Sequence, residues 1–177
     1  WSSDVCSSDL DLPQPMVIEL SDAQVSELQA LLGVELVREV RPRLIDVGAR
    51  WIVAQLRDAG TVLAARPDMV RMARQDVQAN ATGVVIFGAH DSDGLGQMEV
   101  RAFAPSCGVA EDPVCGSGNG CVAVFVRDTA QTDRFGSSYI ATQGQVVGRE
   151  GQVLISIEPE DRKSTRLNSS HVSESRM

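Results

Sequence analysis

The hydrophobic pattern near the start of the chain predicts a short apolar run followed by an amphipathic helix. Residues 16–20 are mostly apolar, and Ser21 then offers a side chain that suits the N-cap of a helix. Apolar positions recur behind it at helical spacing, at Val25, Leu28, Leu31 and Leu32. Gly33 is a typical helix stop, so we expect the helix between Ser21 and Gly33.

The next part of the chain predicts three strands. Residues 35–40 alternate between polar and apolar positions before Pro42 ends the segment, and residues 51–56 form a nearly continuous apolar run. Residues 61–65 form another run, separated from the previous one by a turn signal at residues 58–60. We expect each of the three segments to be a strand.

A second helix and four further strands follow. Pro67 suits the first position of a helix, and the apolar residues that share one face behind it are Met69, Val70, Met72 and Ala73. The four strands are expected at residues 84–87, 98–103, 138–147 and 152–157. Polar, glycine-bearing connections at residues 91–96 and 148–151 join them in pairs, which predicts two hairpins.

The six apolar residues at 121–126 can be assigned in two ways. They fit either a buried strand or a helix that is buried on all sides. Propensity favours a strand, because Val and Phe are strand formers. The pattern alone leaves both assignments open.

The two ends of the chain lack this patterning. Residues 1–10 and 163–177 are rich in serine, show no periodicity and resemble translated sequencing-adapter sequence. Natural disordered tails are the alternative. We therefore expect a non-native leader at residues 1–10, a folding unit at residues 11–162 and a non-native tail at residues 163–177. The chain is treated as a possible fragment of a longer protein.

Composition and charge narrow the function classes. The 177 residues carry a net charge of -8, which argues against nucleic-acid binding, because that function needs a concentrated basic surface. The sequence contains no apolar run near the roughly 20 residues of a membrane span and no signal-peptide pattern. We expect a cytoplasmic protein that contacts neither nucleic acid nor a membrane.

Cysteine and histidine spacing gives no sign of a metal site. The four cysteines are Cys6, Cys107, Cys115 and Cys121, with no C-x-x-C pair among them. The only histidines are His90 and His171. We therefore expect free thiols and no metal.

The densest group of reactive side chains lies at residues 111–120, which read EDPVCGSGNG. Glycine lets a backbone approach a ligand closely, and the N–H groups of a helix that starts there would cradle a carboxylate or phosphate. Asp112 or Cys115 could then transfer a proton at a bound carbon acid. A surface turn is the alternative, whereas the spacing does not match the G-x-G-x-x-G loop or the P-loop of nucleotide-binding proteins.

The sequence around this loop resembles the phenazine-biosynthesis-like (PhzF-like) family. Residues 101–105 read RAFAP and residues 108–113 read GVAEDP, similar to a family signature in which R-x-F-A-P leads into G-x-x-E-D-P-x-x-G-S. Gln143-Gly144 and Gly148-Arg149 resemble the family's closing hairpin. The similarity extends from the first strand to Glu158, and the chain is expected to be the C-terminal half of such a protein.

The resemblance implies an α+β fold of the diaminopimelate-epimerase type. In that fold a mostly antiparallel, curled sheet surrounds a central buried helix. Residues 121–126 would then lie in the helix, against their strand propensity.

The resemblance also implies roles for individual residues. Asp112 would contact the substrate and assist proton movement, and Ser117 would hydrogen-bond to the substrate. The backbone N–H groups of Gly116, Ser117 and Gly118 would hold its carboxylate. Asn119 completes the expected substrate-binding set.

Cys115 is a departure that opens an alternative. Many PhzF-like proteins have threonine at this place, whereas the related diaminopimelate epimerases and proline racemases have a catalytic cysteine directly before G-S/T-G. A helix N-terminus lowers the pKa of a thiol, so Cys115 suits that role. The other interpretation is that Cys115 is a small residue that stands in for threonine.

Together these features predict a cofactor-independent isomerase that acts on a small carboxylate by proton abstraction and return. The resemblance implies a catalytic glutamate in an N-terminal half without a counterpart here, so we expect the isolated chain to be nearly inactive. The alternatives are a cysteine-dependent racemase that uses Cys115 and a non-catalytic carboxylate-binding module. A homodimer is left open.

Overall fold

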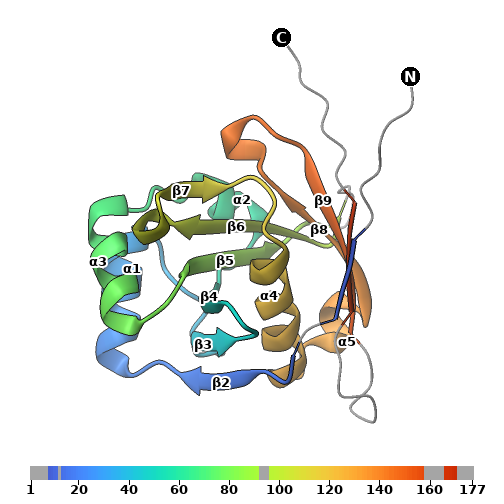
Figure 1. The fold of residues 1–177 in the computed structure, drawn as a ribbon, viewed down its shortest axis with the longest axis horizontal. Helices are drawn as coiled ribbons and strands as arrows, with labels where there is room; N and C mark the ends of the chain where they lie inside the picture. Colours follow the sequence, from blue (N-terminus) through green and yellow to red (C-terminus); the bar gives the residue numbers. More distant parts are fainter. Residues whose placement is uncertain (1–7, 12, 92–95, 158–165, 171–177) are drawn as a thin grey trace.

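A mixed sheet of ten strands carries helices on both of its faces (Figure 1). The computed structural model describes residues 8–11, 13–91, 96–157 and 166–170. The strands are β1 (Ser8–Asp11), β2 (Met16–Glu19), β3 (Arg43–Asp46), β4 (Arg50–Gln55), β5 (Gly83–Ala89), β6 (Met98–Ala104), β7 (Val109–Asp112), β8 (Ser138–Gln143), β9 (Gly151–Ser156) and β10 (Arg166–Ser170). The α-helices are α1 (Asp22–Leu32), α2 (Ala59–Ala64), α3 (Met69–Ala79), α4 (Gly116–Asp128) and α5 (Thr132–Phe135), and two 3-10 turns are η1 (Pro105–Cys107) and η2 (Gln145–Val147).

The strand order is β1-β10-β9-β8-β6-β5-β4-β3-β2, and β7 pairs separately with β6. Among the described strands, only the pairs β4–β5 and β6–β8 are parallel. The sheet is therefore mostly antiparallel, as predicted. It curls around α4, which contacts strands from distant parts of the order: β3, β4, β5, β9 and β10 (Figure 1).

Alternation along the central strands separates two hydrophobic cores. In β4, Trp51 and Val53 face the core around α4, whereas Ile52 and Ala54 face a second core beneath α1, α2 and α3. This is the period of two that a strand covered on both faces produces. The first core positions the N-terminus of α4, where the candidate site lies.

Residues 121–126 lie in helix α4, which confirms the helix that the family resemblance implies for them. Its residues from Cys121 to Val126 are all within 1% of complete burial, because the sheet encloses the helix on every side. Strand propensity is a weak preference and is overridden by such packing. The local pattern therefore could not identify this helix.

Several local predictions are confirmed. Ser21 caps α1, with its side chain accepting from the Gln24 N–H, and Gly33 ends the helix in the left-handed region at φ 68°. The predicted strands at 51–56, 84–87, 98–103 and 152–157 correspond to β4, β5, β6 and β9. The first hairpin pairs β5 with β6, although residues 92–95 of its connection lie outside the described residues.

Two strand predictions are wrong. Residues 61–65 lie mostly in α2, because Asp58 is an N-cap whose carboxylate accepts from the Thr61 N–H at 2.7 Å. Residues 35–40 form no strand, since only Leu36 is buried and the strand begins after Pro42, as β3.

In three further places the structure differs from a predicted element boundary or buried face. Helix α3 begins at Met69 behind the N-cap Asp68, so Pro67 lies before the helix and not at its first position. Val70 is 65% exposed and does not share the buried face of Met72. The strand predicted over 138–147 stops at Gln143, because Gly144 turns the backbone at φ 96° into η2.

The elements β3, β7 and α5 were not predicted, and neither were β1 and β10. β10 pairs antiparallel with both β9 and β1, so paired strands occur within both terminal segments, 1–10 and 163–177. The origin of the terminal segments stays a prediction. Within the described ranges, no helix has the length and apolar character needed to cross a membrane.

Candidate functional site

The candidate site is the loop between β7 and the N-terminus of α4. β7 pairs with β6, with Asp112 opposite Ala102, and α4 begins at Gly116 with Cys115 as its N-cap. The chain therefore passes from a strand edge to a helix N-terminus within three residues. This geometry brings Asp112 and the first N–H groups of α4 to the same loop.

A buried ion pair anchors the strand that leads into the loop. The guanidinium of Arg101 donates from Nε and Nη2 to the two carboxylate oxygens of Glu111, at 2.9 and 2.8 Å. Its Nη1 also donates to the carbonyls of Val62 and Ala65 at the end of α2. Such a bidentate pair fixes orientation as well as position. Glu111 therefore supports the loop, because both of its carboxylate oxygens are occupied by Arg101.

The side chain of Gln143 in β8 holds the loop from behind. Its Nε2 donates to the Asp112 carbonyl at 2.7 Å, and its Oε1 accepts from the Cys115 N–H at 3.2 Å. Asn119 donates from Nδ2 to Gln143 Oε1 at 2.8 Å and to the Cys115 carbonyl at 2.9 Å. The structure thus places Asn119, predicted to bind substrate, among the fully buried residues that support the loop.

Asp112, Gly116 and Ser117 are partly exposed and form the open face of the loop. One oxygen of Asp112, Oδ1, accepts from the Val114 N–H at 3.0 Å, which fixes the carboxylate. Among the described residues, the N–H groups of Gly116 and Ser117 have no hydrogen-bond partner. These N–H groups point out of a helix N-terminus, an arrangement that attracts an anion.

The third predicted N–H group is already occupied. The Gly118 N–H donates to Cys115 Sγ at 3.3 Å, so it is unavailable to a substrate carboxylate. Gly118 is required for packing instead, because a Cβ there would come within 3.0 Å of both Cys115 Sγ and Val85 Cγ2. The cradle therefore consists of two N–H groups.

Cys115 is buried and serves as the N-cap of α4. Burial raises the pKa of its thiol to about 11, and the hydrogen bond from the Gly118 N–H only partly opposes this. The sequence-based expectation of a lowered pKa is therefore wrong: removal from water outweighs the helix N-terminus. This environment favours a packed, neutral thiol.

Ser117 is held by a residue that the sequence did not connect with the site. Trp51 Nε1 donates to Ser117 Oγ at 3.0 Å, and Cys115 Sγ lies 3.7 Å from the same oxygen. Trp51 and Gln143 could not be identified from spacing, because they lie 66 and 28 residues from their loop partners. The sequence pattern assigns Gln143-Gly144 to the closing hairpin and does not link Gln143 to the loop.

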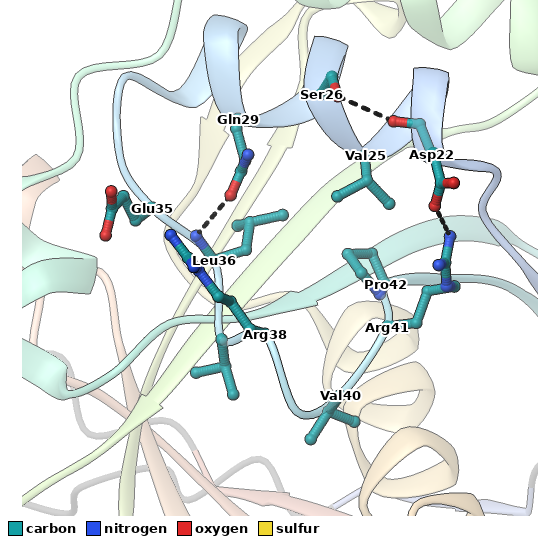
Figure 2. Close-up of a pocket in the computed structure, with 11 residues that line it drawn as sticks. Asp22, Val25, Ser26, Gln29, Glu35, Leu36, Arg38, Val40, Arg41 and Pro42 are labelled. Carbon is teal, nitrogen blue, oxygen red and sulfur yellow. Dashed lines mark hydrogen bonds and ion pairs between the residues drawn. The ribbon is translucent and has the colours of Figure 1, made fainter.

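A pocket elsewhere on the described surface lies apart from this loop. Figure 2 shows a pocket of about 370 Å³ between α1 and residues 35–42, and none of its lining residues belongs to the loop at 111–120. An ion pair between Asp22 and Arg41 closes one side of it (Figure 2). Over the described ranges, no group of three His, Cys, Asp or Glu side chains could hold a metal ion.

Relatives with curated names share a large part of the chain. "Antisense-enhancing sequence 1" of Schizosaccharomyces pombe is 32% identical over 156 residues, which is 86% of this chain and 51% of that protein. An "uncharacterized isomerase" of the same yeast is 32% identical over 118 residues, covering 66% of this chain and 62% of that protein. The chain thus spans between about half and two thirds of their lengths.

Solved structures share the fold. A Bacillus anthracis phenazine biosynthesis protein of the PhzF family superposes with a TM-score of 0.72 at 16% identity, covering 92% of this chain and 56% of that one. A protein described as a "Predicted Epimerase" from Pseudomonas aeruginosa gives 0.71 at 18% identity, covering 94% and 56%. These matches confirm the α+β, diaminopimelate-epimerase-like fold. The sequence profile of the phenazine biosynthesis-like proteins matches residues 2–173, so the chain belongs to the PhzC-PhzF family.

Proposed function

We propose that this chain is one lobe of a cofactor-independent isomerase that acts on a small carboxylate by proton abstraction and return at carbon. The observation that carries the proposal is the open face at the start of α4. There, two N–H groups without a partner among the described residues, the Ser117 hydroxyl and the Asp112 carboxylate lie within six consecutive residues, at partly exposed positions.

The arrangement suits the chemistry of a carbon acid. A carboxylate held by the N–H groups of Gly116 and Ser117 gains stabilisation when negative charge develops on it during deprotonation of the neighbouring carbon. The Asp112 carboxylate is fixed through Oδ1 by the Val114 N–H, so it is held in place to assist a proton transfer. The family resemblance implies that a glutamate from a second lobe moves the proton itself.

Solvent deuterium exchange tests the proposal. The chain alone is expected to bind small carboxylates but to exchange no hydrogen at the substrate carbon. Joined to the rest of its own coding sequence, it is expected to catalyse exchange, and Asp112→Ala should abolish it. Isomerisation by the present chain alone, lost on Asp112→Ala, would overturn the single-lobe part of the proposal.

A carboxylate-binding module without catalysis is the second candidate. It shares the same cradle, and the raised pKa of Cys115 favours it over a thiol-based racemase. Binding without exchange in the longer protein, insensitive to Asp112→Ala, would support the module. The racemase alternative requires that alkylation of Cys115 abolish activity, and retained activity would exclude it.

The proposal extends to the cofactor, the location and the partners of the protein. The protein is expected to need no cofactor, to work in the cytoplasm and to bind neither nucleic acid nor membranes. Whether it forms a homodimer is measured directly by light scattering.

A further inference from the structure

The hydrogen bond between Trp51 and Ser117 restricts what Ser117 can do. An indole Nε1–H can only donate, so at 3.0 Å it must occupy a lone pair of Ser117 Oγ. A serine hydroxyl carries a single proton of its own. With one acceptor position filled from within the protein, that proton is directed elsewhere.

Among the described residues, one other group is in hydrogen-bonding contact with the Ser117 hydroxyl. This group is Cys115 Sγ at 3.7 Å, a weak acceptor that already receives the Gly118 N–H. Ser117 is partly exposed on the open face of the loop. Its hydroxyl is thus left to donate toward a bound ligand.

Trp51 is itself immobile. It is 3% exposed, it lies in β4 between Ile45 of β3 and Gly83 of β5, and its side chain belongs to the core around α4. The ring packs so closely on β5 that a Cβ at Gly83 would lie 2.9 Å from Trp51 Cζ3. The indole therefore cannot turn away to release the serine.

We infer that Trp51 is a positioning residue that makes the Ser117 hydroxyl a hydrogen-bond donor to the ligand. This rests on the proposed carboxylate-binding function and deepens it. The ligand must present an acceptor oxygen to the Ser117 hydroxyl. The N–H groups of Gly116 and Ser117 make the same demand, because they too can only donate. The site selects an oxyanion over an amine because these three neighbouring groups all act as donors.

The first measurement needs no ligand. The chain has two tryptophans, so a spectrum of ¹⁵N-labelled protein shows two indole N–H signals, and Trp51→Phe identifies the one from Trp51. Ser117→Ala should shift that signal and speed its exchange with solvent. An unchanged signal would overturn the inference.

The second measurement is a double-mutant cycle with benzoate as the probe, a carboxylate without a hydrogen on the adjacent carbon. Trp51→Phe and Ser117→Ala should each weaken binding by about 3- to 10-fold, the size of one net hydrogen bond. If Trp51 acts through Ser117, the double variant binds no more weakly than Ser117→Ala alone. Multiplying effects would overturn the inference and leave carboxylate binding intact.

Two controls separate the outcomes. Phe87→Leu alters the same core without touching Ser117, so it should lower stability and leave benzoate affinity unchanged. If Phe87→Leu weakens binding as much as Trp51→Phe, the effect is one of general packing and the inference fails. Absence of benzoate binding in the wild-type chain, with the indole signal still responsive to Ser117→Ala, would overturn the proposed function and the donor role together.

Discussion

At the scale of single residues, the thiol of Cys115 occupies the N-cap of α4, where an oxygen acceptor would bind the helix N–H groups better. Its Sγ accepts the Gly118 N–H at 3.3 Å as the N-cap of α4, whereas hydroxyl and carboxylate side chains are the preferred N-caps. Cys115→Thr should therefore raise the free energy of unfolding by about 0.5 to 1 kcal/mol, measured by urea denaturation. Cys115→Ala, which has no acceptor, is expected to lower it. A threonine variant less stable than the wild type would contradict the capping role.

Glu99 is a buried acid outside the candidate site. Its Oε2 accepts from Thr142 Oγ1 and lies 3.5 Å from His90 Nε2, and the neighbouring charges are Arg101 and Glu111. Burial raises the pKa of Glu99 from 4.5 to about 7, and the hydrogen bond from Thr142 only partly opposes this. Between these two pKa values the folded state holds a proton that the unfolded state has lost. The free energy of unfolding therefore falls as pH rises through this window.

Glu99→Gln removes that titration. Relative to the wild type, the variant should lose the decline between pH 4.5 and pH 7 and be more stable at pH 8, by on the order of 3 kcal/mol at most. Urea denaturation across the pH range measures the difference between the two profiles. Glu150→Gln, at an exposed position, is the matched control and should leave the profile as it is. Parallel profiles for Glu99→Gln and wild type would show that Glu99 is ionised throughout.

At the scale of elements, the β8–β9 hairpin keeps the loop in shape. Gln143 bridges the Asp112 carbonyl, the Cys115 N–H and Asn119, and a Cβ at Gly144 would come within 2.7 Å of the Pro113 carbonyl. The hairpin therefore packs against the backbone of the loop directly. Asp112 and the helix start depend on a strand that follows them in the sequence.

Gln143→Leu should remove the hydrogen bonds between the hairpin and the loop. The Cys115 N–H and the Asp112 carbonyl lose their bonds to Gln143, and Asn119 keeps only its bond to the Cys115 carbonyl, so we expect a loss of about 2 to 4 kcal/mol in the free energy of unfolding. Hydrogen exchange should accelerate most at the Cys115 N–H. Gln145→Leu makes the same change at an exposed position two residues away and should have little effect. Equal exchange at Cys115 in both variants would refute the clamp.

Elements with strong local signals were predictable from the sequence, and those decided by tertiary packing were not. The cap at Ser21 and the stop at Gly33 bound α1 as expected. For α2, the N-cap signal of Asp58 was present but was interpreted as a turn. In α4, strand-forming residues are helical because the sheet surrounds them, and only the family resemblance indicated this.

In the candidate site, too, some residues were predictable from the sequence and others were not. Asp112 and Ser117 could be named because they lie in one continuous motif. Trp51 and Gln143 reach the motif through the register of β4 and β8, which no spacing in the sequence encodes. The pKa of Cys115 was predicted in the wrong direction, since burial of a side chain depends on the whole core.

At the scale of the whole molecule, two core clusters fill the part of the chain whose side chains the structure describes. Within residues 13–91 and 96–157, their buried members extend from Leu20, just after β2, to Ile157, just after β9. β10 nevertheless pairs along the length of β9 and contacts α4. The terminal strands thus extend the sheet beyond β9 through backbone pairing.

A chain of residues 11–162 tests this division. With both core clusters intact, it should unfold in a single cooperative urea transition, at a modest cost in the free energy of unfolding. Loss of β10 would leave β9 as an open edge, with Leu154 already 41% exposed, so the shortened chain should self-associate more readily in size-exclusion chromatography. A broad transition without cooperativity would mean that the paired ends belong to the folding unit. In that case the boundary inferred from the serine-rich sequence would be wrong, because strand pairing at the edge of a curled sheet would contribute to holding α4 in place.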